Sequence, residues 1–413
     1  MLALRSRSLV RTACCSCQSL LPKRRCLSSS PALDPSPAAI PLPPYRVLFF
    51  GADSFSCVTL KAIHDARADL IDHLVVVTPP DQRTGRRLKE VHRPPLRLLA
   101  EELNLESIAL PSTLLQGWEP PSPFLAPSSS SPPSPQNLLL TASFGHLLPT
   151  ALLSLFLPLN TLNVHPSLLP RYRGAAPIQW GIIDGDADKA GDEGAMGVTV
   201  QELSRGKFDR GRILGQTRVS VPPHADFPTL EPILAKAGGD LLVSILRDLP
   251  SRQAAARPQD PALATLAPKL TKASARIDWA AKSATEVLRV QRGVGHQYPL
   301  WTTLAGPPAP PPAPAPTQLL QLVLSPTTVV PLSNLSHSLS LSSPTPTQPG
   351  SLIFDPTSKK LLVVCGAAAD EAVVVDKVKK EGGKWVDARE WWNGAVNAKK
   401  RAGSGSGSGL RFE

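Results

Sequence analysis

Two polar side chains, Asn163 and His165, are the strongest candidates for chemistry in this chain of 413 residues. They lie in the segment LNVHPSLLPRYRGAAP, where an apolar run ends at a proline. In an extended strand, residues two apart point to the same side, so an amide donor and a titratable ring would lie together. An amide that binds a developing oxyanion and a ring that moves a proton are what acyl transfer requires. Taken alone, such a pair is more often a hydrogen-bonded core Asn and His.

A third candidate, Asp209, lies in the sequence KFDRGRIL, directly before an expected strand. A carboxylate placed there can orient a histidine and balance its charge. An Asp-x-Gly sequence is common in turns and carries little information by itself. Joined to the Asn-x-His pair it becomes specific, and we predict that Asn163, His165 and Asp209 converge on one pocket.

These segments resemble the methionyl-tRNA formyltransferases, within the wider group of enzymes that transfer formyl from 10-formyltetrahydrofolate. The resemblance covers most of residues 45–300 and rests on VVTPPDQRTGRRLKE, ASFGHLLP, NVHPSLLPRYRGAAPIQW, FDRGRIL and APKLTKASARIDW. It implies catalytic roles for Asn163, His165 and Asp209. It also implies a folate site lined by Ser167, Leu168, Leu169 and Pro170, with Phe144, Gly145 and Leu147 as walls of the pterin pocket.

The resemblance implies a mechanism without a metal or a covalent enzyme adduct, and 10-formyltetrahydrofolate would be a co-substrate. The α-amino group of the methionyl ester would attack the formyl carbon. Asn163 would donate to the oxyanion, His165 would help to pass a proton to N10, and Asp209 would hold His165 and a water in place. Arg212 follows the Asp-x-Gly where relatives often have an acidic or neutral residue.

The expected nucleic-acid partner is initiator methionyl-tRNA. The loop at 81–89 carries four cations around Gly85 and resembles the family loop that enters the acceptor end. Such cations can contact phosphates or stack on a base, although a merely solvated basic loop remains an alternative. The candidate tRNA-binding residues are Arg83, Arg86, Arg87, Lys89, Arg171 and Arg173.

The first 33 residues are rich in arginine and serine and contain no acidic residue, which is typical of a mitochondrial transit peptide. A disordered basic tail is the alternative. Without the six cations of this leader the formal charge falls from +11 to +5, which is compatible with a polyanionic partner. We expect a protein of the mitochondrial matrix that is a monomer and does not span a membrane.

The elements that position the candidates predict an α/β domain over 45–250. Apolar runs at 45–50, 71–78, 137–144 and 161–164 predict buried strands, and helical patterns between them indicate a Rossmann-like, mostly parallel sheet. We expect Ser54 to cap the first helix. The turn after Gly51 lacks the further glycines of a dinucleotide site, so we expect no nucleotide there. The segment 119–136, rich in Ser and Pro, predicts a disordered insertion.

After a linker at 251–264, the sequence predicts a smaller domain over 265–400. A short strand at 275–279, a helix at 285–290 and strands at 351–354, 360–364 and 372–378 indicate a small OB-like β-barrel. We expect a low-complexity insertion at 306–349 and a flexible tail at 401–413. Four of the six cysteines lie in the leader without matching ligand pairs, so no zinc site is expected, and Cys57 and Cys365 are expected to be buried thiols.

Formyl transfer to methionyl-tRNA for mitochondrial translation initiation is thus the expected function. A formyltransferase that acts on a small amine is one alternative, against which the second domain and the basic loop argue. A tRNA-binding protein that keeps the fold without turnover is the other. Binding alone would not require Asn163, His165 and Asp209 together.

Overall fold

The computed structural model describes residues 44–413 apart from gaps at 85–86, 88, 113–114, 116, 126–131, 190–195, 305–317, 335–347, 356, 367, 369 and 402–409. The chain divides into a leading unit, Met1–Leu42, and a second unit, Pro43–Glu413, which contains everything described below. The expected transit peptide and Arg86 of the basic loop lie outside the described residues. No described helix has both the length and the apolar character needed to cross a membrane.

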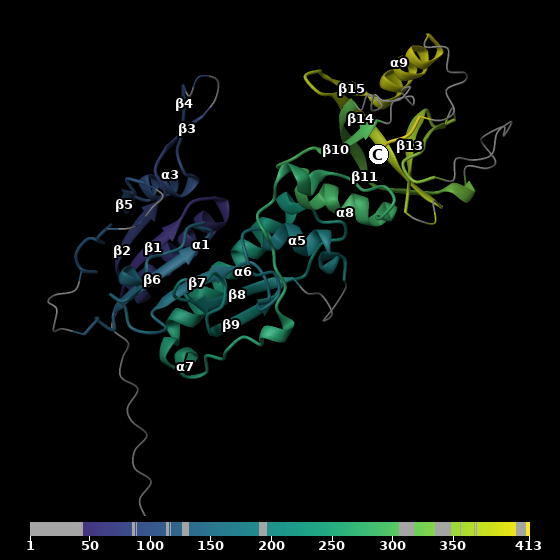
Figure 1. Cartoon of the computed structure of the whole chain (residues 1–413). Coiled ribbons are helices and arrows are strands. Elements are labelled where there is room, and N and C mark those ends of the chain that lie inside the picture. The colour runs from purple at the N-terminus through teal and green to yellow at the C-terminus, as the bar shows by residue number, and fades with distance from the viewer. Residues whose placement is uncertain are drawn as a thin grey trace, which may run out of the picture. The chain divides into compact units, whose positions relative to one another are not determined.

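A seven-stranded sheet has the strand order β5-β2-β1-β6-β7-β8-β9 (Figure 1). The first five strands in this order are parallel, whereas β8 and β9 continue the sheet antiparallel. The predicted α/β fold with a mostly parallel sheet is confirmed. The strands are β1 (Tyr45–Gly51), β2 (Ile71–Thr78), β5 (Glu106–Ala109), β6 (Asn137–Ala142), β7 (Thr161–His165), β8 (Gly197–Glu202) and β9 (Ile213–Arg218).

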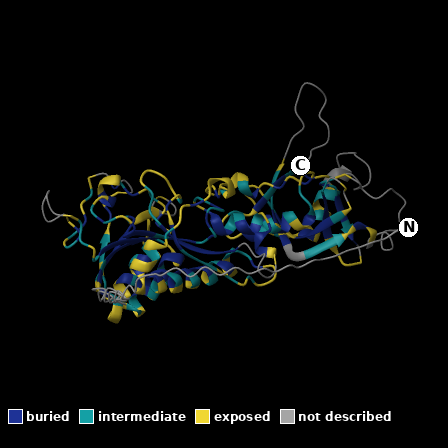
Figure 2. Ribbon diagram, turned by 90° about the horizontal axis from the view of Figure 1, so that it is seen from below, coloured by how far each residue is buried: buried dark blue, intermediate teal, exposed yellow. Residues whose placement is uncertain are grey.

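Both faces of this sheet are buried, which explains why its central strands are continuous apolar runs. In β1, Val47 and Phe49 face one hydrophobic core, whereas Leu48 and Phe50 face another. Figure 2 shows the central strands as buried. The helices of this part are α1 (Ser54–Asp65), α2 (Arg67–Leu70), α3 (Pro95–Glu102), α4 (Thr150–Leu153), α5 (Pro177–Ile183), α6 (Phe227–Arg247) and α7 (Leu249–Ala254), with 3-10 turns η2 (Asp186–Asp188) and η4 (Pro261–Leu263).

The N-terminal cap of α1 differs from the prediction. Asp53, not Ser54, caps the helix, because its Oδ1 accepts a hydrogen bond from the backbone N–H of Ser56 at 3.2 Å. A carboxylate in this position satisfies one of the free N–H groups of the first helical turn. The cap also places the carboxylate of Asp53 at the carboxyl end of β1.

A second, antiparallel sheet follows, with the order β10-β11-β14-β13-β12 and with β15 paired to β14. Leu304 bridges Phe412, and Ser351 bridges Arg411, so the end of the chain joins both edges of this sheet. The prediction of a C-terminal β domain is confirmed. Its elements are η5 (Lys272–Ala275), α8 (Ala284–Val294), β10 (Leu300–Leu304), β11 (Gln318–Pro331), η6 (Leu332–Asn334), β12 (Leu352–Asp355), β13 (Lys360–Cys365), β14 (Glu371–Lys380), β15 (Trp385–Asp387) and α9 (Ala388–Arg401).

Two predictions of unstructured segments are wrong in part. Within 119–136, Phe124 is 1% exposed and packs in the same core as Phe50. Burying an aromatic ring removes a large apolar area from water, and this stabilises the ring in the core although its sequence neighbours are Ser and Pro. Within 306–349, β11 pairs with both β10 and β14. Leu320, Leu322 and Leu324 are buried at alternate positions, which is the pattern of a strand with one face in the core.

The C-terminal segment also differs from the expected flexible tail. Phe412 is 1% exposed and packs with Trp279 and Trp391 in the core of the second sheet. The apolar ring anchors the chain end, while residues 402–409 lie outside the described part. The strand expected at 275–279 is absent from these described residues, which form the end of η5 and one bridge between Arg276 and Trp301.

Candidate active site

A row of polar side chains crosses three neighbouring strands. Strand register pairs Thr141 of β6 with Asn163 of β7, and Asn163 with Gln201 of β8. The hydroxyl of Thr141 donates a hydrogen bond to Oδ1 of Asn163 at 2.7 Å. Because the amide oxygen of Asn163 is thus occupied, its Nδ2 group is left as a donor, and it has no partner among the described side chains. Asn163 therefore presents two N–H bonds in the wall of the cavity described below.

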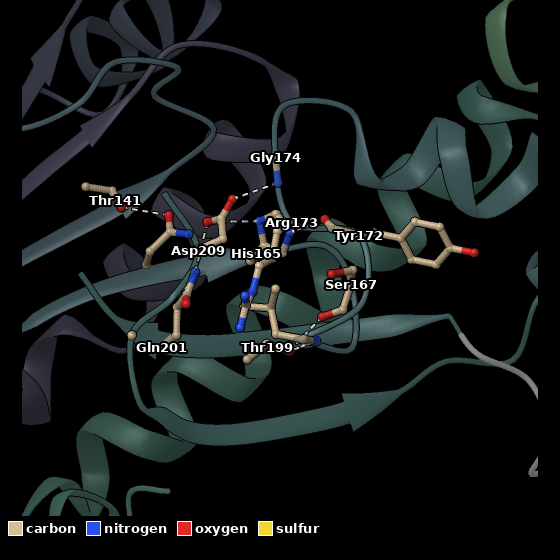
Figure 3. Close-up of polar contacts among 12 residues, drawn as sticks. Thr141, His165, Ser167, Tyr172, Arg173, Gly174, Thr199, Gln201 and Asp209 are labelled. Atoms are coloured by element: carbon tan, nitrogen blue, oxygen red, sulfur yellow. Dashed lines mark hydrogen bonds and ion pairs between the residues drawn. The ribbon is translucent and has the colours of Figure 1, made fainter. Parts of the chain in front are cut away.

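His165, at the end of β7, has a polar neighbour at each ring nitrogen (Figure 3). Its Nε2 lies 2.9 Å from the carbonyl oxygen of Tyr172, which can only accept, so Nε2 carries a hydrogen. Its Nδ1 lies 3.5 Å from Oδ1 of Asp209. Both side chains are at least nine-tenths buried. This second contact is longer than an ordinary hydrogen bond, which leaves Nδ1 as the ring nitrogen free to exchange a proton.

The carboxylate of Asp209 is fixed by two hydrogen-bond donors. Its Oδ2 accepts from the backbone N–H of Gly174 at 2.9 Å, and its Oδ1 accepts from Nε2 of Gln201 at 2.9 Å (Figure 3). Gly174 has φ +129°, and a Cβ there would lie 2.5 Å from the carbonyl oxygen of Ala267. Only glycine fits this conformation and this space. The three predicted catalytic residues therefore converge, as expected.

Asn163, His165 and Asp209 line a cavity of about 410 Å³. Phe144, Gly145 and Leu147, predicted as walls of a pterin pocket, lie in its lining. So does Asp53, whose Oδ2 accepts a hydrogen bond from the hydroxyl of Ser143 at 2.8 Å. Burial raises the pKa of the Asp53 carboxyl, and the hydrogen bonds from Ser143 and Ser56 oppose that rise. Asp53 was not predicted as a site residue, and the only signal for it in the sequence is its place two residues after the glycine that ends β1.

The other predicted folate residues, Ser167 to Pro170, do not line this cavity. Ser167 and Leu169 are buried, and their backbone is tied to the sheet by one hydroxyl. Thr199 Oγ1 donates to the carbonyl of Ser167 at 2.7 Å and accepts from the N–H of Leu169 at 3.0 Å. In the structure these four residues hold the loop after His165, and their direct contact with folate stays a prediction.

Gln259 is a site residue that the sequence analysis missed, within the expected linker. Its side chain is 9% exposed. Its Nε2 donates to Oε1 of Gln201 at 3.0 Å and to the carbonyl oxygens of Asp209 and Gly211 at 3.1 and 2.9 Å. Gln259 therefore fixes the loop that carries Asp209. No local pattern distinguishes it from the other polar residues of that segment.

The predicted tRNA-binding residues lie in two places. Arg83 is in a short hairpin formed by β3 (Gln82–Thr84) and β4 (Glu90–His92), and Arg83, Arg87 and Lys89 are exposed. Arg171 forms an ion pair with the buried carboxylate of Asp186. The guanidinium of Arg173 donates to Oε1 of Gln259 at 2.7 and 3.0 Å. Arg171 is thus paired within the protein, whereas the hairpin cations face solvent.

No group of three or more His, Cys, Asp or Glu side chains with metal-binding geometry occurs in the described part of the chain. Cys365 is buried and Cys57 is half-buried, and both are free thiols. Arg212, the cation that follows the Asp-x-Gly sequence, has its Nε 3.3 Å from Oε2 of Glu202 and forms no ion pair with Asp209. Its positive charge is therefore balanced by Glu202, which lines the cavity, and not by Asp209.

Comparison with protein families gives two matches. A model described as formyl transferase matches residues 45–246, and one described as formyl transferase, C-terminal domain, matches residues 269–396. The fold and the site thus define a two-domain formyl transferase.

Comparison with individual relatives shows to which family of formyl transferases the chain belongs. The chain is 33% identical over 360 residues to a mitochondrial methionyl-tRNA formyltransferase of Bos taurus, which covers 86% of this chain and 78% of the relative. It is 30% identical to the methionyl-tRNA formyltransferase of Paraburkholderia phymatum over 89% of this chain and 97% of that one. The chain belongs to the methionyl-tRNA formyltransferase family. An N-formyltransferase structure from Helicobacter canadensis has a TM-score of 0.47 at 12% identity and covers 80% of this chain and 99% of that one, a likeness too slight to support any argument.

Proposed function

We propose that this protein transfers the formyl group of 10-formyltetrahydrofolate to the α-amino group of initiator methionyl-tRNA. The observation that carries the proposal is the convergence of Asn163 with the His165–Asp209 pair on one cavity of about 410 Å³. Membership of the family supports the acceptor, and the lining by Phe144, Gly145 and Leu147 supports a flat, partly apolar donor. The donor's formyl carbon would lie beside Asn163.

In the proposed reaction the amine nitrogen forms a bond to the formyl carbon, and the bond from that carbon to N10 of the folate then breaks. The carbonyl oxygen becomes an oxyanion in the tetrahedral intermediate. The Nδ2 group of Asn163 donates to that oxyanion, since Thr141 already holds the amide oxygen. One oriented donor of this kind contributes about 3 kcal/mol of transition-state stabilisation.

Proton transfer is assigned to Nδ1 of His165, because Nε2 is occupied by the carbonyl oxygen of Tyr172. The attacking amine loses a proton and N10 gains one, so a single ring that accepts and returns a proton balances the step. Asp209 stabilises the charged ring during this exchange, and its hydrogen bonds to Gly174 and Gln201 keep it in place. A positioned acid–base group of this kind contributes about 10²–10⁴-fold to the rate.

The nucleic-acid side of the proposal rests on exposed cations. The hairpin residues Arg83, Arg87 and Lys89 would contact the acceptor end, and Arg86 is included on the sequence resemblance alone. In the C-terminal domain, Nζ of Lys379 lies 5.7 Å from the ring centre of Trp385, and Trp385 is 38% exposed. Trp391, by contrast, is buried in the core of that domain. Arg86→Ala is expected to raise the tRNA concentration needed for half-maximal rate.

The deciding experiment is a comparison of acceptors. The mature chain is incubated with labelled 10-formyltetrahydrofolate and with methionyl-tRNA, free methionine or glycinamide ribonucleotide. Label is expected in methionyl-tRNA alone, and His165→Ala is expected to remove this transfer while tRNA still binds. Labelling of a small amine would favour the first alternative function. Binding of tRNA without any transfer would favour the second.

We also propose that residues 1–33 direct the chain to the mitochondrial matrix, where it acts as a monomer. The mammalian relatives are named as mitochondrial proteins, which supports this location. A fusion of residues 1–33 to a reporter should enter isolated mitochondria only when the membrane potential is intact. A fusion that enters without the potential, or that stays outside, would contradict the assignment.

A further inference from the structure

The backbone of Tyr172 has a conformation that is unfavourable for a large side chain. Its φ is +60°, in the left-handed region, which glycine adopts without strain and bulky residues rarely do. A residue of this kind remains there only where the surrounding contacts hold it. Tyr172 lies seven residues after His165, in the segment that leaves β7. Its contacts therefore decide how this segment returns to the histidine ring.

The returning segment directs two backbone groups at the catalytic pair. The carbonyl oxygen of Tyr172 lies 2.9 Å from Nε2 of His165, and the N–H of Gly174 donates to Oδ2 of Asp209 at 2.9 Å. A neutral imidazole has a single N–H, and two acceptors compete for it. The carbonyl oxygen of Tyr172 is nearer than Oδ1 of Asp209, which lies 3.5 Å from Nδ1. The position of this carbonyl thus selects the ring nitrogen that carries the hydrogen.

Three contacts hold Tyr172 in its left-handed conformation. Its hydroxyl donates to Oδ2 of Asp186 at 2.5 Å, and its backbone N–H donates to Oγ1 of Thr265 at 2.8 Å. Its ring is buried, and the guanidinium carbon of Arg171 lies 5.3 Å from the ring centre. Figure 3 shows the ring pointing away from His165. The hydroxyl is therefore anchored on one side of the segment while the carbonyl faces the catalytic ring on the other.

Asp186, the acceptor for this hydroxyl, is itself fixed in place. Asp186 belongs to η2 and is 2% exposed, and it forms ion pairs with Arg171 and with Lys189, the latter at 2.7 Å. Burial and the hydrogen bond to Asp186 raise the pKa of Tyr172, so the hydroxyl keeps its proton near neutral pH and remains a donor. Removing the hydroxyl leaves the carboxylate with its two cations. A Tyr172→Phe protein is therefore expected to fold.

We propose that Tyr172 is a positioning residue that sets the tautomer of His165 through its hydrogen bond to Asp186. While this bond holds, the carbonyl oxygen of Tyr172 accepts the hydrogen of Nε2, and Nδ1 is free to take a proton. Without it the backbone relaxes from the left-handed conformation, and the carbonyl moves away from Nε2. The carboxylate of Asp209 then accepts the ring hydrogen at Nδ1. The kinetic part of this inference rests on the proposed function, whereas the tautomer can be observed without it.

The first test observes the tautomer directly. The full chain is labelled with nitrogen-15 in histidine, and spectra at about pH 8.5, where an unperturbed ring is neutral, distinguish a protonated ring nitrogen from an unprotonated one. The signals of His165 are identified by their absence in His165→Ala. The wild type is expected to carry the hydrogen on Nε2, and Tyr172→Phe is expected to carry it mainly on Nδ1.

Tyr45→Phe is the matched control. Tyr45 is 3% exposed, and its hydroxyl has no hydrogen-bond partner in the described part of the chain. The same atom is therefore removed from a buried tyrosine without the loss of a bond. Tyr45→Phe should leave both the His165 signals and kcat unchanged.

The second test measures turnover with methionyl-tRNA. Tyr172→Phe should lower kcat about tenfold, less than the roughly 10²–10⁴-fold loss of an acid–base group, because the ring remains in place. The KM values for both substrates should not change. Asp186→Asn keeps an acceptor for the hydroxyl and should retain the Nε2 tautomer and kcat, whereas Asp186→Ala should behave like Tyr172→Phe. Thermal unfolding checks that each variant is folded at the assay temperature.

Three results would overturn the inference. The first is a wild-type ring with its hydrogen on Nδ1. The second is a Tyr172→Phe ring that keeps its hydrogen on Nε2, or a Tyr172→Phe protein whose KM rises at constant kcat. The third is an Asp186→Asn protein that loses the tautomer, which would assign the effect to the charge of Asp186 and not to the hydroxyl. A wild-type chain that does not formylate methionyl-tRNA would refute the proposed function, and the spectra would still decide the role of Tyr172.

Discussion

Nδ1 of His165 lies 3.5 Å from Oδ1 of Asp209, although His165 ends β7 and Asp209 lies in the loop between β8 and β9. The loop can return to β7 because its base is tied down: Gln259 donates to the carbonyl oxygens of Asp209 and Gly211. At Gly211 a Cβ would lie 1.7 Å from the carbonyl oxygen of Glu202. The geometry of the pair is therefore built from backbone contacts in three separate segments.

The hydroxyl of Thr141 should set the direction of the Asn163 amide. Thr141→Val keeps the shape of the side chain and removes the donor to Oδ1 of Asn163. The amide is then free to rotate but keeps its N–H groups, so we expect kcat to fall about tenfold, less than the roughly 10²–10³-fold cost of removing an oxyanion donor outright. The KM for methionyl-tRNA should not change, and Thr141→Ser should restore the rate.

A matched control for this substitution is Thr59→Val. Thr59 is equally buried, and its hydroxyl donates to the carbonyl of Phe55 in α1, away from the cavity. It should leave kcat unchanged. If Thr141→Val instead raised the KM at constant kcat, Thr141 would act in substrate binding and not in positioning Asn163.

Gly174→Ala should disturb both stability and activity. The new Cβ would meet the carbonyl oxygen of Ala267, and the φ of +129° is unfavourable for alanine. We expect a loss of more than about 1 kcal/mol in the free energy of unfolding, measured with urea, together with lower kcat as the N–H donor to Asp209 moves. Gly382→Ala separates the two causes, because Gly382 has φ +71° with nothing within 4 Å. A similar loss in both variants would mean that strain alone, without the clash, explains the effect.

The ion pair between Asp188 of η2 and Arg292 of α8 should stabilise the protein. Nη2 of Arg292 lies 2.8 Å from the carboxylate, and the Arg292 side chain is only 6% exposed. Asp188→Asn leaves this buried cation without its charged partner, so we expect a loss of about 2 kcal/mol, below the roughly 3–5 kcal/mol for a fully buried pair because Asp188 is partly exposed. Asp240→Asn is the control, because its pair with Lys236 is exposed and should be worth less than about 1 kcal/mol.

The effect of Asp188 should depend on pH. Burial alone would raise the pKa of Asp188, but the hydrogen bonds and charges of Arg292 and Arg289 outweigh it, and the pKa lies below its usual value. Since the folded-state pKa is the lower one, the stabilisation is complete above the unfolded-state pKa of about 3.9 and is lost as the pH falls through the folded value. The stability difference between wild type and Asp188→Asn should therefore be constant near neutrality and shrink in acid. A difference that grew in acid would reverse this sign.

Cys57 and Cys365 should be unreactive in the native protein. Burial, with the nearby charges of Asp53 and Glu231, raises the pKa of Cys57 to about 11, and burial raises the pKa of Cys365 to about 12. At pH 8 no more than about one thiol in a thousand is then a thiolate, the form that reacts. Alkylation mapped by mass spectrometry should leave both positions unmodified until denaturant is added. Rapid native labelling of Cys365 would show that the second sheet opens readily.

The sequence by itself determined the parts of the site that depend on local periodicity. The strand at 161–165 and the alternation of side chains along it place Asn163 and His165 on one face, and the continuous apolar runs predicted the buried parallel strands. These features depend only on residues close together in the chain. The sequence also indicated Asp209, from its place in a glycine-containing loop before a strand, and the resemblance implied its catalytic role; the structure places it in the lining of the cavity.

The tertiary structure decided what surrounds these residues. Thr141 and Gln201 join Asn163 only through the register between strands, and Gln259 reaches the Asp209 loop from a segment expected to be a linker. The strand β11 and the buried ring of Phe124 were hidden because their neighbours in sequence are rich in Ser and Pro. Strand register and long-range burial depend on which surfaces meet after folding, and no short window of sequence contains both partners.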